Sequence, residues 1–268
     1  MNIYVQLTHE FNAGRMRTII SSGQAVVLHQ LAIMSKDGDW ILREDNEALT
    51  HVLAVLSSHG AHYRFGAPLD IRWLMNGWSS HFEFMQNGLR IRTDFVTRPP
   101  RISLTRLEQI WIEQQTRELP FVDMADLAEL KKTNREKDYA VIGELTRMMI
   151  TIEDQLRYSR SAREIIELSN KHPAVAMAIA IERPVIAAAT QGIERLEVKL
   201  DAERRYLMHT NEKRLARYQR ASEQWAELWP DLERKIAPLS IVEAHQIITG
   251  QALQVLPFTP EPGVINHD

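Results

Sequence analysis

The feature that most constrains the fold is a change in the spacing of apolar residues at Pro99-Pro100. Before this point, short stretches that alternate apolar and polar residues, which favour strands, lie between segments with helical spacing. After it, apolar residues recur at helical spacing almost to the end of the chain. The pattern predicts an α+β protein with a mixed sheet flanked by helices, followed by a mostly α-helical C-terminal half.

The first hundred residues are expected to hold three helices and six strands. The helices are predicted at 2–13, 24–31 and 46–58, and the strands at 17–21, 36–43, 62–65, 71–74, 82–85 and 89–97, with a hairpin turn at 86–88. In the second half we expect helices at 104–115, 124–149, 152–169 and 185–228, with breaks near Pro120, Pro173, Pro184 and Pro230. The expected domains are 1–102 and 103–250, followed by an irregular tail at 251–268.

The composition excludes several kinds of site. The chain of 268 residues contains no cysteine, which rules out disulfides, thiolate metal sites and cysteine nucleophiles. Any metal must therefore bind to carboxylates or histidines. The 32 basic residues are offset by 35 acidic ones, so contact with nucleic acid would require a local patch of positive charge.

The N-terminal stretch and the apolar runs predict a cytoplasmic protein without a membrane span. Residues 1–18 mix charged and apolar side chains and lack the apolar core of a signal peptide. The longest apolar run, at 174–181, is far shorter than the roughly 20 residues that cross a bilayer.

Three aspartates form the main candidate site. Asp37 and Asp39 are two residues apart on an expected strand, so both carboxylates should lie on one face, and Asp94 lies on a later strand. Such hard oxygen ligands suit Mg²⁺ or Mn²⁺. Upstream, Ser22 and Gly23 lie between a strand and a helix, where small residues let backbone N–H groups approach a triphosphate. An Asp-x-Asp pair is also common on turns, where it is solvated or caps a helix, so the pair alone leaves both interpretations open.

The order and spacing of these residues resemble the nucleotidyltransferase superfamily, which includes polymerase β and many bacterial toxins. The matching residues are Ser22-Gly23, Asp37-x-Asp39 and Asp94, and the segment 23–29 is similar to a Gly-x-Ala-x-x-Leu-His pattern of toxin-type members. The chain departs from the usual motif at Ser22, where the first glycine of the turn is expected.

A second stretch, at 126–145, resembles the helical segment of abortive-infection type nucleotidyltransferase toxins. That resemblance implies that the helical domain completes the nucleotide cleft. The residues it implies as nucleotide-binding are Lys131, Lys132, Arg135, Lys137 and Asp138. The two lysines are alternatives for one phosphate contact, and an ordinary solvated helix face is the competing interpretation.

The resemblance implies an enzyme that uses two Mg²⁺ or Mn²⁺ ions, held by Asp37, Asp39 and Asp94, to move NMP from an NTP to a hydroxyl acceptor. Toxin-type relatives suggest tRNA or a protein as acceptor, and an antitoxin as partner. Two alternatives stay open: a catalytically inactive binding module with this fold, and a small-molecule enzyme of the aminoglycoside nucleotidyltransferase type.

Overall fold

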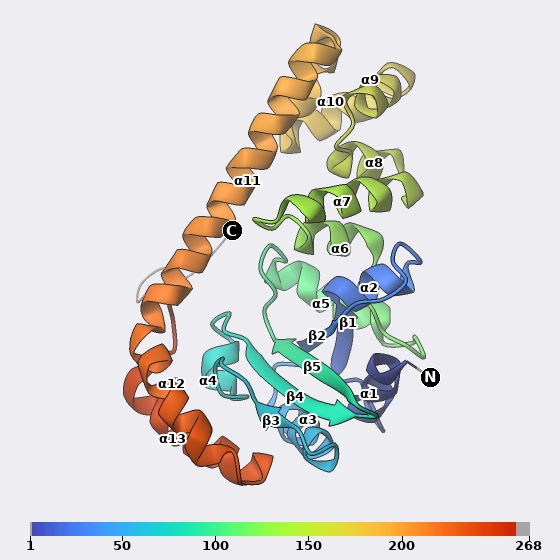
Figure 1. Ribbon diagram of the computed structural model, residues 1–268. Coiled ribbons are helices and arrows are strands. Elements are labelled where there is room, and N and C mark those ends of the chain that lie inside the picture. Colours follow the sequence, from blue (N-terminus) through green and yellow to red (C-terminus); the bar gives the residue numbers. More distant parts are fainter. Residues whose placement is uncertain (1, 261–268) are drawn as a thin grey trace. The chain divides into compact units, whose positions relative to one another are not determined.

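The computed structural model describes residues 2–260 (Figure 1). The chain divides into two compact units, one of residues 1–122 with 216–268 and one of residues 123–215. They are called the first unit and the second unit below, and each is described by itself.

The first unit is built on a mixed five-stranded sheet with the order β1-β2-β5-β4-β3. Its strands are β1 (Thr18–Ser21), β2 (Asp37–Leu42), β3 (His62–Tyr63), β4 (Ser80–Gln86) and β5 (Leu89–Val96). Strands β2 and β5 are parallel, whereas the other pairs are antiparallel. The turn between β4 and β5 has positive φ at Asn87 and Gly88, as a tight hairpin requires.

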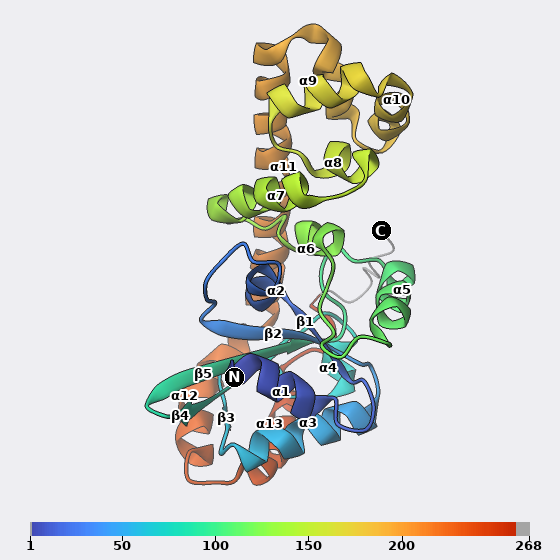
Figure 2. The same ribbon diagram turned by 90° about the vertical axis from the view of Figure 1, so that its right-hand side faces the viewer.

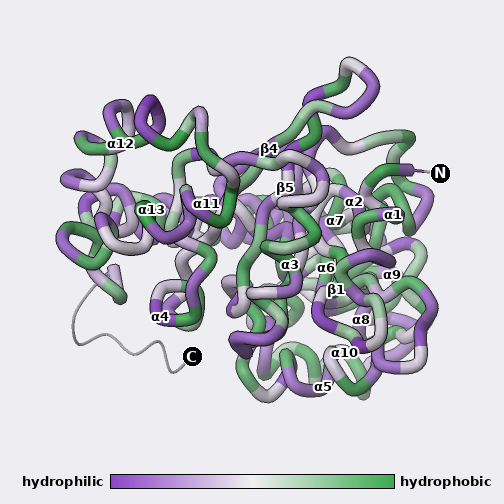
Figure 3. The backbone as a smooth tube through the Cα atoms, turned by 90° about the horizontal axis from the view of Figure 1, so that it is seen from below, coloured by the Kyte–Doolittle hydropathy of each residue, from purple (hydrophilic) through white to green (hydrophobic). Residues whose placement is uncertain are grey.

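One face of this sheet is apolar and covered by helices. Phe82, Phe84, Thr93 and Phe95 are buried and alternate along β4 and β5 with more exposed residues. Figure 3 shows β4 and β5 side by side, coloured by the hydropathy of each residue. Figure 2 shows helices α1 (Ile3–Phe11) and α3 (Asn46–Ser58) on one side of the sheet and α2 (Ser22–Leu28) on the other. The opposite, polar face is thereby left for the candidate site.

Helices from distant parts of the sequence complete the first unit. They are α4 (Ile71–Leu74), α5 (Leu104–Gln114), α12 (Glu223–Ile236) and α13 (Ile241–Val255). Trp225 on α12 is buried and its indole N–H donates to the carbonyl of Gly66 over 2.9 Å, and the Tyr63 hydroxyl is 2.7 Å from His245 Nδ1 on α13. As predicted, Trp225 and Trp229 are core residues, with ring centroids 5.7 Å apart.

The second unit is helical, so the α+β prediction is confirmed. Its elements are α6 (Met124–Leu130), α7 (Glu136–Met148), α8 (Ile152–Tyr158), α9 (Ala162–Lys171), α10 (Pro173–Glu182), the 3₁₀ helix η1 (Pro184–Gln191) and the greater part of α11 (Ile193–Ala221). Leu156, Ile165, Ile179 and Leu196 are at the centre of its apolar core.

Three sequence expectations about these elements are wrong. Residues 71–74 form α4 and not a strand, because Asp70 caps the segment by accepting from the Arg72 amide. Pro230 lies inside α12, whose buried Trp225, Trp229 and Leu232 hold the helix across the missing amide donor. The segments 124–149 and 152–169 each contain two helices instead of one.

The compact units also differ from the expected domain boundaries. Residues 103–122 and 216–250 group with the sheet, whereas the sequence suggested a single helical domain over 103–250. The expected irregular tail at 251–268 is helical as far as Val255, and its residues 261–268 lie outside the described part of the chain. Among residues 2–260, no helix is both long and apolar enough to cross a lipid bilayer.

Candidate functional site

The register of the parallel strands brings the three predicted aspartates together. Asp39 on β2 is directly paired with Asp94 on β5, and Asp37 lies two residues before Asp39. Neighbouring strands are about 4.8 Å apart, and residues two apart on a strand share a face, so all three carboxylates lie on the polar face. The register therefore gathers the three carboxylates on one face of the sheet.

The buried side of β2 determines which way the aspartates point. Gly38 and Trp40 alternate with them, and a side chain at Gly38 would overlap the rings of Tyr4 and Trp40. The Tyr4 hydroxyl donates to the carbonyl of Lys36 over 2.7 Å. The pKa of Tyr4 is raised, mainly by burial and to a smaller extent by the negative charge of Asp37, so its hydroxyl remains a hydrogen-bond donor. These contacts hold Asp37 and Asp39 toward the opposite face.

The predicted Ser22-Gly23 turn borders the carboxylates. Ser21, the last residue of β1, is paired with Asp39, and α2 begins at the next residue. Ser22 has a φ of 50°, in the left-handed region that favours glycine. A Cβ at Gly23 would overlap the Ser35 hydroxyl, which donates to the carbonyl of Asp37. The segment therefore requires a small residue at 23, as the motif does.

Asp94 has two partners that the sequence analysis missed. His81 Nδ1 is 2.7 Å and Arg64 Nη1 is 3.2 Å from the same oxygen, Asp94 Oδ1. On its other side, His81 Nε2 is 2.8 Å from the hydroxyl of Ser79. The available signal was the alternation of β4, which puts His81 and Glu83 on the polar face between the buried Ser80, Phe82 and Phe84.

Glu83 is the centre of a second polar group on this face. Arg90 donates to both of its oxygens over 2.7 and 2.8 Å, while Arg64 and Arg92 approach it to 3.5 and 4.0 Å. His62 Nε2 lies 3.3 Å away. Burial alone would raise the pKa of Glu83, but its hydrogen bond and charge interaction with Arg90 lower it below the ordinary value. Glu83 is therefore ionised at neutral pH. Arg90 and Arg92 share the face of Asp94, as the alternation of β5 predicted.

One carboxylate oxygen of Asp37 is enclosed, although the Asp37 side chain as a whole is 41% exposed. Oδ1 of Asp37 is buried, yet it accepts no hydrogen bond from the residues that the structure describes. The guanidinium of Arg92 approaches the same oxygen only to 3.7 Å. Since a buried carboxylate oxygen without a donor is costly, a hard cation fits this position.

In the second unit, the predicted nucleotide-binding residues Lys131 and Arg135 both contact a third one, Asp138. Asp138 accepts from the Thr133 hydroxyl over 2.5 Å and from Arg135 Nε over 2.7 Å, and the Lys131 ammonium lies 3.4 Å from it. Burial opposes ionisation, but Thr133 and the charges of Lys131 and Arg135 lower the pKa of Asp138. Lys131 and Arg135 therefore converge on the ionised carboxylate of Asp138.

The neighbouring Lys132 belongs to a different cluster in the same unit. Its ammonium lies 2.5 Å from Glu129 and 5.0 Å from the centre of the Tyr158 ring. Burial lowers the pKa of Lys132, against the opposite effect of Glu129. Lys137 is exposed on α7. The two candidate lysines thus differ in their partners.

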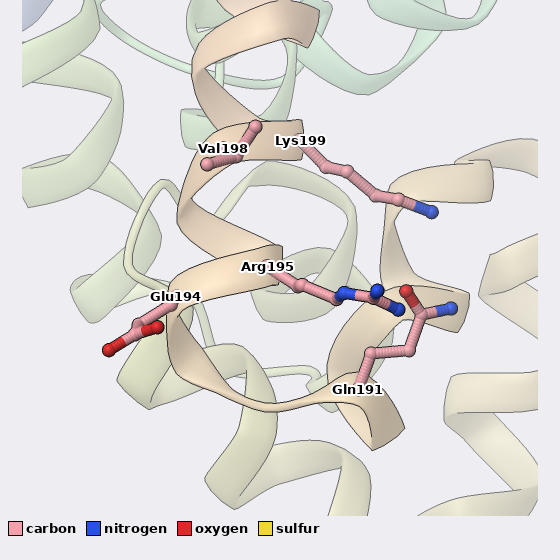
Figure 4. A pocket seen from close by; sticks show the side chains of 5 residues that line it. All are labelled: Gln191, Glu194, Arg195, Val198 and Lys199. Atoms are coloured by element: carbon pink, nitrogen blue, oxygen red, sulfur yellow. The ribbon is translucent and has the colours of Figure 1, made fainter.

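A shallow open pocket in the second unit offers no comparable site. It is lined by Gln191, Glu194, Arg195, Val198 and Lys199. Figure 4 shows the Arg195 guanidinium beside the Gln191 amide, while Glu194 points away from both. Its single carboxylate does not converge with the other polar groups, in contrast to the aspartates of the first unit.

Comparisons with known proteins add little to this geometry. No protein-family model and no curated protein matches the chain. Two solved structures from Helicobacter pylori are distantly similar, each at 10% identity and a TM-score of 0.39. One, provisionally named a nucleotidyltransferase, aligns over 79% of this chain and 96% of its own, and the other, JHP933, over 80% and 93%. Because this likeness is so low, the site is interpreted from its own residues.

Proposed function

We propose that the first unit is a metal-dependent nucleotidyltransferase, which moves the NMP group of an NTP to a hydroxyl of an acceptor. The observation that carries this proposal is the pairing of Asp39 with Asp94 on adjacent parallel strands, with Asp37 on the same face. The Ser22-Gly23 turn at the start of α2 is next to Ser21, which is paired with Asp39. This combination supports phosphoryl chemistry better than either feature would alone.

The three aspartates would hold two Mg²⁺ or Mn²⁺ ions. All three carboxylates would contribute oxygen ligands to them. When bound, such ions offset the charge of the triphosphate and make the acceptor hydroxyl easier to deprotonate. The buried Asp37 Oδ1, which has no donor among the described residues, is the atom that fits this role most directly.

In the transfer, the acceptor oxygen bonds to the α-phosphorus, and the bond from this phosphorus to the bridging oxygen of the β-phosphate breaks. Pyrophosphate leaves with the electron pair of that bond. The proton of the acceptor hydroxyl goes to a base, for which we propose Asp94. His81 and Arg64 both contact Oδ1 of Asp94 and so orient its carboxylate.

The resemblance of the sequence to toxin-type enzymes extends the proposal to tRNA or a protein as acceptor, and to an antitoxin as partner. An incorporation assay with labelled NTPs and Mg²⁺ would test it, with total tRNA, protein and an aminoglycoside as rival acceptors. Label in one acceptor, lost in Asp39→Asn, is the expected result. Absence of label from all three would leave the alternative of an inactive binding module.

A further inference from the structure

The polar face of the sheet carries a cluster of positive charge to which the proposed transfer gives no role beyond the contact of Arg64 with Asp94. It consists of Arg64, Arg90 and Arg92 around Glu83, and is called the arginine cluster below. The register explains how it forms, because Glu83 is paired with Arg92 on β5 and with His62 on β3. Arg90 precedes Arg92 by two residues, so the two lie about 6.8 Å apart along the same strand.

The charges of this cluster do not balance. Three guanidiniums face one carboxylate, whose side chain is 12% exposed beneath them, while that of Arg90 is 55% exposed. Arg64 also lies 3.2 Å from Asp94, and Arg92 lies 3.7 Å from Asp37. If those aspartates hold cations, as the proposed function requires, two positive charges remain in excess at this position.

The geometry of the cluster suits the binding of an anion. Arg90 donates hydrogen bonds to both oxygens of Glu83, which fixes its side chain. It therefore loses less side-chain entropy on binding a ligand than a freely rotating arginine would. Guanidiniums match phosphate oxygens in a two-pronged geometry, which makes arginine the usual residue for recognising them. Arg90, whose side chain is 55% exposed, and its cross-strand partner Met85 are both open to solvent.

We propose that the arginine cluster binds a phosphate group of a substrate, with Arg90 as its main contact and Glu83 as the residue that restrains its affinity. This inference rests on the proposed function, and it adds a phosphate site next to the carboxylates. Two sources supply the same chemistry: the triphosphate of the NTP and the sugar-phosphate backbone of a nucleic-acid acceptor.

Two binding measurements distinguish these sources without turnover. One uses an NTP analogue with a non-hydrolysable α,β linkage in Mg²⁺, and the other a fluorescent single-stranded oligonucleotide over a range of KCl concentrations. Arg90→Gln should weaken binding of one probe about threefold to tenfold, as expected for an exposed charged contact. If the oligonucleotide is that probe, its salt slope should fall by about 0.7.

Glu83→Gln provides the sharper test, because it removes the one negative charge and keeps the shape. It should strengthen binding of the probe that Arg90→Gln weakens. Arg15→Gln is the matched control, since Arg15 is also exposed in the first unit and paired with two carboxylates, Asp45 and Glu47. Thermal melting would verify that each variant is folded.

The outcomes separate this inference from the proposed function. If neither probe responds to Arg90→Gln, or if Arg15→Gln has the same effect, the arginine cluster is not a phosphate site, whether or not transfer is observed. If Arg90→Gln weakens one probe while the wild-type protein transfers no nucleotide, the phosphate site holds and the proposed function fails.

Discussion

The three aspartates are held in different ways, and this bears on what their removal would do. Asp94 contacts His81 and Arg64, whereas Oδ1 of Asp37 is buried and accepts no hydrogen bond from the described residues. Three carboxylates on one face also repel one another. Loss of one of them should therefore affect metal binding far more than folding.

We predict that Asp37→Asn and Asp39→Asn each lower the rate of nucleotide transfer by about a hundredfold or more. Loss of a group that only orients a metal ligand costs about tenfold to a hundredfold in activity, and loss of the ligand itself should cost at least as much. The midpoint of thermal unfolding should hold or rise, since like-charge repulsion is relieved. Transfer assays and calorimetry on the same samples would measure both. Wild-type transfer in either variant would show that the metal site is elsewhere.

His81 should act on the metal through Asp94. Its Nδ1 is 2.7 Å from Asp94 Oδ1, and Gly66 and Ser79 enclose its ring. We predict that His81→Gln weakens Mn²⁺ binding about tenfold, measured by titration without NTP. His81→Asn should restore most of the affinity, because its amide N–H lies nearest to the position of Nδ1. Equal losses in the two variants would mean that His81 only fills space.

Ser22 occupies a backbone conformation that favours glycine, at φ 50°. Ser22→Gly removes that strain but adds freedom to the unfolded chain, so the free energy of unfolding should stay level or rise by about 1 kcal/mol at most. Urea unfolding would measure it. Ser57→Gly, within helix α3, is the control and should lower the free energy of unfolding by about 0.5 kcal/mol. A similar loss at Ser22 would contradict this account.

Among the elements, α13 is attached to the sheet by a pair that depends on pH. The Tyr63 hydroxyl is 2.7 Å from His245 Nδ1, and the rings stack with centroids 6.1 Å apart. Burial lowers the pKa of His245, against the opposite effect of Asp70. The folded protein thus favours neutral His245, whereas the unfolded chain takes up a proton near the ordinary pKa of about 6.5.

The free energy of unfolding should therefore be level above about pH 6.5 and decrease as the pH falls below it, by at most about 1.4 kcal/mol per pH unit from this residue. His245→Asn, which keeps an acceptor but does not titrate, should flatten that part of the curve. Urea unfolding between pH 5 and 8 would measure this, with His9→Gln at an exposed position as control. An unchanged slope in His245→Asn would assign the pH dependence to other groups.

The elements also show what could be predicted from the sequence. Strand β5 and helix α3 were located well because each repeats its period over eight or more residues. Residues 71–74 are too few to distinguish a helix from a strand, and the Asp70 cap decided the outcome. The alternation of β2 and β5 predicts that the three aspartates share one face, as the register shows, but the pairing of His81 with Asp94 depends on the register of β4 against β5.

For the whole molecule, the sequence did not reveal how the chain returns to the sheet. Trp225 and Trp73 donate to carbonyls of Gly66 and Leu256, which are more than 150 residues away from their donors in the sequence. The period of α12 and α13 predicts an apolar face but does not identify what that face packs against. For this reason residues 216–250 were expected in the helical domain, whereas they group with the sheet.

The second unit tests whether the function extends beyond the sheet, and its two candidate lysines give different expectations. The Lys131 ammonium is 3.4 Å from Asp138, which Thr133 and Arg135 already contact more closely. Lys132 is 2.5 Å from Glu129 and lies against the ring of Tyr158. Loss of Lys131 leaves Asp138 with the closer contacts of Thr133 and Arg135. Loss of Lys132 leaves Glu129 with the neutral hydroxyl of Tyr158 in place of an ammonium.

We predict that Lys131→Met raises the KM for NTP about tenfold to a hundredfold, which corresponds to one charge-assisted phosphate contact of about 1.5–3 kcal/mol. Lys132→Met should instead lower the free energy of unfolding by about 1–3 kcal/mol and leave the KM almost unchanged. Methionine keeps the apolar stem in both variants, so only the charge differs. Steady-state kinetics and urea unfolding on both proteins separate the two roles. If neither variant changes the KM, NTP recognition does not involve these lysines, and the resemblance of 126–145 to the toxin segment reflects a charged helix with a structural role.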